Sequence, residues 1–490
     1  MLKIILCLCF MNLIQFSSNE KLIFASLHSR HGARAPLNCD DNHKDFLGEK
    51  WTNPGELTAT GHRMEYILGL RNRQRYITGK YKKFLSDQYD PHEILVCSTN
   101  VNRTLLSMTS QLQGLYPSSS KAGHVLTPEQ MYVSYPPINV SCEEIENEVD
   151  NLNNSALPNF MTVIPIHTTT SSERKMNVQD SKGCKNKVNR TRDNNKVTNK
   201  NVIDAANYFN NKYTKNLSNY FEKNVGNFTY DFDWIGLFCD TLVSDYSDGR
   251  KMTDFFNRTK IEVHEFVKDC RKMIATNFRD DFFGDTKNQV ILLAESNLIQ
   301  EVLHYMKQKI DDDINDAKFN VSDYSRPKML IYSGHDSTLT GEELFMIKHF
   351  GLTIDDYIYP TYTSQLAFEV TRDDEKPKDI NYSSYKVTFY FNDKVLVETN
   401  FDEFQKTVKK SVWSKARIDD FCDDDANSDE RNVANNSSSL QLYVIFALAF
   451  LVLIFLIIII VLIMKLNKKN QETNNTPNTN DGPLLNEDEN

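Results

Sequence analysis

The segment Lys21 to Pro36, KLIFASLHSRHGARAP, decides the fold of this chain. Residues 21–27 form a mostly apolar run with the length of a buried strand, and a polar loop follows directly. Ligands of open α/β sheets bind outside the carboxyl ends of strands, so we expect a binding loop at Arg30 to Pro36. Two arginines flank His31 there, which suits an anion such as phosphate. We interpret Gly32 as the residue that lets the backbone approach the ligand.

The same pattern of an apolar strand followed by a small polar loop occurs twice more. Residues 93–96 precede Ser98 and Thr99, and residues 328–333 precede a loop with His335 and Asp336. Helix-period segments alternate with these strands. The sequence therefore predicts an α/β fold, with a mostly parallel sheet and helices on both faces, interrupted by a mostly helical cap.

The composition excludes several classes of protein. Of 490 residues, 66 are acidic and 56 basic, giving a formal net charge of -10. This balance argues against a protein that coats nucleic acid, and we expect no nucleic-acid partner. A hydrophobic fraction of 40% with 11% aromatic residues is compatible with a globular core and excludes a collagen-like or wholly disordered chain.

Both ends of the chain carry apolar segments typical of a secreted, membrane-anchored protein. Residues 1–18 have the layout of a signal peptide. Residues 442–464 are uncharged and long enough, at about 1.5 Å per residue, to span a bilayer as one helix. Lys465, Lys468 and Lys469 follow that segment directly. The positive-inside rule then predicts type I topology, with the N-terminal bulk outside the cytosol.

The cysteines and glycosylation motifs fit that compartment. Two of the nine cysteines fall in the signal peptide, and the odd number that remains means that at least one thiol is left over. The remaining cysteines are Cys39, Cys97, Cys142, Cys184, Cys239, Cys270 and Cys422. Glycosylation motifs occur at Asn139, Asn153, Asn189, Asn216, Asn227, Asn257, Asn320 and Asn381.

The first and third loops together resemble the histidine acid phosphatase family, branch 2 of the histidine phosphatase superfamily. Its two marks are R-H-G-x-R-x-P, here Arg30 to Pro36, and His-Asp, here His335 and Asp336. The segment Ser98 to Thr104 resembles the family stretch that supplies a further phosphate-binding arginine, Arg103. The likeness covers about residues 21–120 and 325–400 well and the cap only loosely. The whole architecture resembles the membrane-bound lysosomal-type acid phosphatases.

The resemblance implies a phosphoric monoester hydrolase that needs no metal and no cofactor. His31 would be the nucleophile that forms a phosphohistidine, and Asp336 would be the proton donor. The phosphoryl oxygens would be held by Arg30, Arg34, Arg103 and His335. The physics agrees, because phosphoryl transfer depends on positioning and charge neutralisation, which planar guanidinium groups supply without a metal ion. The same cations should keep His31 neutral and nucleophilic.

Two features depart from the family pattern. Cys97 stands where many members have arginine, so we do not count it as a ligand. Asn102 lies in a formal glycosylation motif beside Arg103, and a glycan there would block the site, so we predict that this motif is unused. By resemblance, Cys142 and Cys422 are expected to form a disulfide that joins the cap to the end of the catalytic domain.

The organisation follows from these segments. We expect a signal peptide (1–18), a discontinuous catalytic core (19–140 and 325–418), a cap with an Asn/Lys-rich loop (141–324), a stalk (419–441), the membrane helix (442–464) and a cytoplasmic tail (465–490). Residues 481–485 of the tail, DGPLL, resemble a sorting signal for endosomes and lysosomes. Adaptor proteins would then be partners, and the alternative location is the cell surface. The sequence leaves a homodimer open.

Three alternatives remain for the function. The leading hypothesis is a phosphatase that acts on small phosphomonoesters. The second hypothesis is a phytase-like or inositol-polyphosphate phosphatase, which would be favoured if Lys and Arg side chains of the cap lined the pocket. A non-catalytic, membrane-tethered phosphate-binding receptor is the alternative from another class. A phosphomutase fits poorly because soluble sugar-phosphate metabolism is cytosolic, whereas this chain is expected to be secretory.

Overall fold

The structure is a computed structural model that describes part of the chain. The described residues are 20–37, 51, 53–120, 124–138, 142–168, 176, 182–220, 230–285, 287–317, 325–375, 377–378, 380–422 and 459–465. The chain divides into two compact units, Met1–Asp423 and Asp424–Asn490. The catalytic motifs all fall in the first unit, and in the second unit residues 459–465 are helical.

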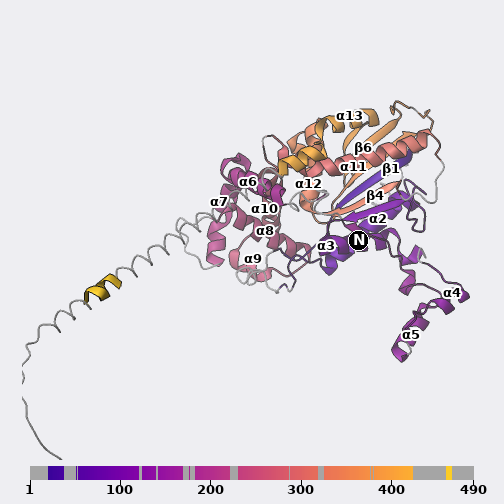
Figure 1. Ribbon diagram of the computed structural model, residues 1–490, viewed down its shortest axis with the longest axis horizontal. Helices are drawn as coiled ribbons and strands as arrows, with labels where there is room; N and C mark the ends of the chain where they lie inside the picture. Colours follow the sequence, from indigo (N-terminus) through magenta and orange to yellow (C-terminus); the bar gives the residue numbers. More distant parts are fainter. Residues whose placement is uncertain are drawn as a thin grey trace, which may run out of the picture. The chain divides into compact units, whose positions relative to one another are not determined.

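The first unit is built on one mixed, seven-stranded sheet (Figure 1). Its strands lie in the order β3 (His167–Thr168), β2 (Ile94–Ser98), β4 (Met329–Gly334), β1 (Glu20–Arg30), β5 (Gln365–Asp373), β6 (Tyr385–Phe391) and β7 (Lys394–Asn400). Neighbours from β3 to β1 are parallel, whereas every pairing from β1 to β7 is antiparallel. The expected mostly parallel sheet is therefore wrong, because short connections between β5, β6 and β7 can only reverse the chain direction.

The register of the parallel strands brings the three predicted loops to one edge of the sheet. Arg30, the last residue of β1, lies opposite Gly334, the last residue of β4. On the other side of β4, Ser98 at the end of β2 lies opposite Ser333. All three strands end at the same level, so the residues that follow them meet at the carboxyl edge.

Helices cover both faces of the sheet, which confirms that part of the prediction. On one face, the π-helical turn η1 (Gln74–Thr78) and α3 (Asn102–Leu115) share a core with residues of β1. Helix α2 (Ala59–Arg73) packs against α3. On the other face lie α11 (Gln289–Ile314), α12 (Asp336–His349) and α13 (Phe401–Ser411). Helix α11 falls within the range predicted for the cap, yet it packs on the sheet.

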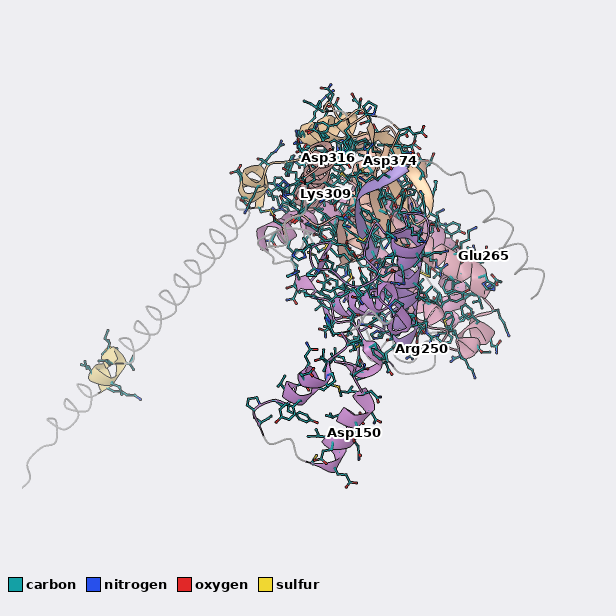
Figure 2. The ribbon with its side chains drawn as sticks, turned by 90° about the vertical axis from the view of Figure 1, so that its right-hand side faces the viewer. Asp150, Arg250, Glu265, Lys309, Asp316 and Asp374 are labelled. Atoms are coloured by element: carbon teal, nitrogen blue, oxygen red, sulfur yellow. A yellow bond between two sulfur atoms is a disulfide. The ribbon has the colours of Figure 1, made fainter. Side chains whose placement is uncertain are left out.

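The other helices are α4 (Pro128–Val133), α5 (Glu143–Leu152), α6 (Lys182–Thr198), α7 (Lys200–Tyr220), α8 (Phe232–Ser247), α9 (Thr253–Thr259), α10 (Val263–Thr276) and the π-helical turn η6 (Asn277–Phe282). Short 3-10 turns are η2 (Ser118–Ser120), η3 (Pro158–Phe160) and η7 (Ile354–Asp356). Helices α7 to α10 enclose an aromatic-rich core of their own and form the cap beside the sheet (Figure 1). Helices α4 and α5 bury no residues, and Figure 2 shows Asp150 of α5 away from the cap residues Arg250 and Glu265.

Glycines set the distance between the loop after β1 and the helices behind it. A Cβ added to Gly32 would lie 2.5 Å from the backbone oxygen of Gly61 in α2. Farther along, a Cβ on Gly69 would lie 1.9 Å from the backbone oxygen of Gln111, so α2 and α3 also touch backbone to backbone. Gly32 therefore allows the loop to contact α2 closely, and its proposed role in letting the backbone approach the ligand stays a prediction.

Two disulfides join cysteines of the described residues, and neither is the predicted one. Cys422 pairs with Cys184 of α6, and Cys239 of α8 pairs with Cys270 of α10. The expected bond between Cys142 and Cys422 is wrong, because Cys142 is exposed at the start of α5 and outside both disulfides. The bond between Cys184 and Cys422 joins α6 to the end of the first unit.

Several predictions fall on parts of the chain outside the described residues. These include the signal peptide, Cys39, the cytoplasmic tail and all but residues 459–464 of the expected membrane helix. Among the helices that the structure describes, none has the length and apolar character needed to cross a bilayer. The segments outside the described residues stay sequence predictions.

Two carboxyl groups are fully buried close to the catalytic loops. Glu65 of α2 accepts a hydrogen bond of 2.9 Å from the Thr363 hydroxyl, and burial raises the pKa of its carboxyl to about 8. Glu343 of α12 accepts a hydrogen bond of 2.7 Å from the Ile358 amide, and burial raises the pKa of that carboxyl to about 8 as well. Both groups are therefore neutral acids at low pH.

We expect these two groups to make the fold more stable in acid than at neutral pH. Their pKa in the folded state exceeds the unfolded value of about 4.3, so their contribution is full below that pH and is lost as the pH rises toward 8. The melting temperature of the wild type should fall by several degrees between pH 5 and pH 8, and the Glu65→Gln/Glu343→Gln double variant should fall less. An equal fall in both proteins would contradict the assignment.

Candidate active site

The structure brings all six predicted site residues together at the carboxyl edge of the sheet. Five of them line a cavity of about 580 Å³ between the sheet edge and the cap: His31, Arg34, Arg103, His335 and Asp336. The sixth, Arg30, lies directly behind and contacts Asp336. They come from the end of β1 and the loop after it, from the first turn of α3, and from the N-cap and first residue of α12.

One hydrogen bond determines which nitrogen of His31 carries its proton. The Nδ1 atom lies 2.9 Å from the backbone oxygen of Gly32. A carbonyl oxygen can only accept, so Nδ1 must be the protonated nitrogen and Nε2 keeps its lone pair. Burial lowers the pKa of His31 well below its ordinary value, and Arg30, Arg103 and Arg34 lower it further. His31 is thus a neutral base even in acid.

His335 has the opposite arrangement of protons. The Arg103 guanidinium, which has only donors, lies 3.3 Å from Nδ1, so Nδ1 accepts and Nε2 donates to the Thr99 hydroxyl at 3.0 Å. Burial and then Arg103 lower the pKa of His335 to about 3. The rings of His31 and His335 are 5.6 Å apart, centre to centre.

Arg30 is held in place from several sides. One of its nitrogens donates to the Tyr359 hydroxyl at 3.1 Å and to the Pro360 carbonyl at 2.8 Å. The other terminal nitrogen forms an ion pair with Asp336 at 2.7 Å, and the guanidinium lies 4.3 Å from the centre of the Tyr362 ring. Its orientation is therefore set before any ligand arrives.

Asp336 is a carboxylate when the cavity is empty. Burial alone would raise the pKa of its carboxyl, but Arg30, then Arg34 and His335, lower it below the ordinary value. The Ser337 amide also donates to it at 3.0 Å. A proton for a departing alcohol must consequently arrive with the substrate or after it binds.

Sequence reasoning missed Asp240, a cap residue that holds Arg34. The Asp240 carboxylate of α8 accepts two hydrogen bonds from Arg34, at 2.8 and 3.1 Å, and one from the Leu37 amide at 3.2 Å. It lies more than 200 positions from Arg34, and nothing in the surrounding sequence indicates the contact. Two carboxylates, Asp240 and Asp336, pair with Arg34 and Arg30, and neither of these ion pairs involves Arg103.

The contacts of Tyr359 and Tyr362 with Arg30 were also not predicted. The tyrosine-rich stretch YIYPTY (357–362) is the sequence feature that could have indicated them. His28 of β1 lies outside the predicted site, and its Nδ1 atom is buried 2.5 Å from a carboxylate oxygen of Glu342. The Asn102 amide donates to Glu56 at 3.1 Å, and whether its glycosylation motif is used stays a prediction.

Among the described residues, no group of three His, Cys, Asp or Glu side chains is arranged to hold a metal ion.

Comparison with known proteins identifies the family. A family model described as the histidine phosphatase superfamily (branch 2) matches residues 21–392. The chain belongs to this family, and the family predicted from the two motifs is confirmed.

Individual relatives match more distantly. The lysosomal acid phosphatase of Xenopus laevis is 38% identical over 107 residues, which is 21% of this chain and 23% of that protein. The lysosomal acid phosphatase of Rattus norvegicus is 24% identical over 392 residues, covering 79% of this chain and 73% of that one. The match to the first of these relatives thus spans under a quarter of its length.

Solved structures support the fold. The phytase of Hafnia alvei in complex with myo-inositol hexakis sulphate aligns with a TM-score of 0.51 at 14% sequence identity, covering 81% of this chain and 98% of the phytase. At this level of identity the likeness concerns the α/β architecture alone, which it confirms.

The contact between Arg34 and Asp240 predicts a split between turnover and binding. In Asp240→Ala, Arg34 loses the partner that orients it, so kcat on a phosphate monoester should fall about tenfold to a hundredfold. The inhibition constant of inorganic phosphate should not rise, because a negative charge beside the anion has been removed. Asp240→Asn keeps the hydrogen-bonding oxygen and should lose less. Steady-state kinetics on the three proteins measures both constants, and an unchanged kcat in Asp240→Ala would refute the positioning role.

Proposed function

We propose that this chain is an acid phosphatase that hydrolyses phosphate monoesters through a phosphohistidine at His31, without a metal ion. The observation that carries the proposal is the hydrogen bond from Nδ1 of His31 to the Gly32 carbonyl. It leaves Nε2 unprotonated in a cavity surrounded by guanidinium groups. A neutral nucleophile next to fixed cations is what attack on an anionic phosphoryl group requires.

In the first step, the lone pair of His31 Nε2 attacks phosphorus and the bond from phosphorus to the ester oxygen breaks. The electron pair goes to the ester oxygen, which takes a proton from Asp336 and leaves as the alcohol. Arg30, Arg34 and Arg103 bind the equatorial oxygens, where charge is spread in the transition state. Both nitrogens of His335 are engaged, so in this proposal the ring positions Arg103, which donates to its Nδ1, rather than contacting the phosphoryl oxygens itself.

In the second step, water attacks the phosphohistidine. Asp336, now a carboxylate, accepts a proton from the water, and the bond between phosphorus and Nε2 breaks. The departing phosphate then takes that proton from Asp336, which becomes a carboxylate again. The cycle starts from a carboxylate at Asp336, so the first proton comes with the phosphate monoester monoanion. Because phosphate monoesters lose that proton at about pH 6, the proposal accounts for activity in acid.

Substitution of the nucleophile tests the proposal. His31→Ala should lower hydrolysis of 4-nitrophenyl phosphate at about pH 5 by at least a thousandfold, since no other group can take up the phosphoryl group. Inorganic phosphate should still bind to the variant through its arginines, as measured by calorimetry, which separates loss of chemistry from loss of fold. Turnover close to that of the wild type would refute the assigned nucleophile.

The alternative of an inositol-polyphosphate phosphatase has one supporting observation. Two cap cations, Arg192 and Lys196 of α6, line the cavity. Each of them is already paired, Arg192 with Asp281 at 2.9 Å and Lys196 with Asp233 at 2.7 Å. Cations neutralised in this way favour substrates with one phosphate group over polyphosphates.

The proposal includes a location: a type I membrane glycoprotein of lysosomes or endosomes, with the catalytic domain in the lumen. It rests on residues 1–18, residues 442–464 and the tail sequence DGPLL (481–485), and the relatives named as lysosomal acid phosphatases agree with it. Sorting adaptors would bind the tail.

A tail variant tests the location. Replacing Leu484 and Leu485 with Ala should move the steady-state population of the full chain from lysosomes to the cell surface, as measured by surface labelling. The matched variant Asn486→Ala, next to the dileucine, should leave the distribution unchanged. An unchanged distribution in the dileucine variant would reject sorting by this motif.

A further inference from the structure

The wall of the catalytic cavity on the cap side differs from the charged wall on the sheet side. It includes Gly236 and Leu237 of α8, Ile274 of α10 and Phe278 of η6. The cap cations in the cavity are paired with carboxylates, as described above. The cap therefore offers an apolar patch opposite the arginines, bordered by charged side chains that are paired with one another or with Arg34.

Gly236 leaves an open space on this wall. A Cβ added there would come within 4 Å of one heavy atom outside the neighbouring residues, the Asn277 side-chain nitrogen at 3.3 Å. Glycine inside a helix costs about 1 kcal/mol relative to alanine, and no close packing of the backbone here requires it. The space beside Gly236 opens into the cavity, because Gly236 is one of its lining residues.

Phe278 connects this wall to the proton donor. Its ring stacks on that of Tyr359, with centres 6.2 Å apart and planes inclined by 19°. The Tyr359 hydroxyl in turn donates to Asp336 at 3.4 Å. The proton donor must reach the ester oxygen, so the alcohol part of the substrate lies on the side of the cavity where Phe278 stands.

We propose that Gly236 and Phe278 form the subsite for the alcohol part of the substrate, and that this subsite takes a planar aromatic group. The ring would lie over the open face of α8 at Gly236 with Phe278 at its side. Aromatic rings pair favourably in offset or edge-to-face arrangements, and their burial against apolar side chains lowers the free energy of binding. This inference rests on the proposed phosphatase function and specifies its preferred substrates as aryl phosphates.

The test uses the purified full-length protein and compares its hydrolysis of a bulky aryl phosphate with its hydrolysis of a small alkyl phosphate. In Gly236→Leu, the new side chain fills the subsite, so KM for 1-naphthyl phosphate should rise at least about tenfold, equivalent to about 1.4 kcal/mol. KM for glycerol 2-phosphate and the inhibition constant of inorganic phosphate should change less than about twofold. Lys268→Leu, at an exposed position of α10 outside the cavity, is the matched control and should alter none of these constants.

Phe278→Ala provides a second variant that does not depend on Leu being accommodated at position 236. It should also raise KM for 1-naphthyl phosphate more than KM for glycerol 2-phosphate. Equal changes for the two esters in both variants would overturn the subsite and leave the phosphatase function intact. Wild-type enzyme that binds phosphate but hydrolyses neither ester would overturn the proposed function. Preference for myo-inositol hexakisphosphate that persists in Gly236→Leu would overturn the aromatic preference.

Discussion

The site depends on two backbone hydrogen bonds at the carboxyl end of β4. The Gly334 carbonyl accepts from the His31 amide at 3.1 Å, and the Ser333 carbonyl accepts from the Thr99 amide at 3.1 Å. Strand β4 therefore fixes where the loops after β1 and β2 begin, relative to the sheet edge. Because α12 begins directly after β4, the same strand also positions His335 and Asp336. A shift of one residue in this register would turn alternate side chains away from the cavity.

Charge balance is the second constraint. Three guanidinium groups lie close together, and those of Arg30 and Arg34 are buried, so they would repel one another strongly without carboxylates nearby. Asp336 pairs with Arg30 and Asp240 pairs with Arg34, so each arginine is oriented and partly neutralised before a ligand binds. The remaining cation attracts the substrate, and the surrounding charges keep His31 neutral. The net charge of the whole chain, which is negative, gave no indication of this local excess of positive charge.

The gathering of the six candidate residues at one sheet edge could be predicted from the sequence, because their motifs follow apolar strands. His31 and His335 adjoin such strands, whereas Arg103 and the roles of all six residues were predicted from the resemblance to the family. Asp240 could not be predicted, because its contact with Arg34 depends on how the cap helices pack against the sheet. The partner of Cys422 was assigned to the wrong cysteine for a similar reason, since Cys184 and Cys142 lie in polar segments with no local signal for pairing. The antiparallel half of the sheet depends on chain reversals that apolar periodicity does not reveal.

The central claim is that Nε2 of His31 becomes covalently phosphorylated. The most direct measurement uses Asp336→Asn with 4-nitrophenyl phosphate, whose leaving group needs little protonation, so that the first step proceeds while the hydrolysis of the intermediate lacks its base. After quenching in alkali, which preserves phosphohistidine, mass spectrometry should find one phosphate group on the peptide that contains His31. A phosphate on any other residue, or release of nitrophenol without a phosphorylated protein, would contradict the account.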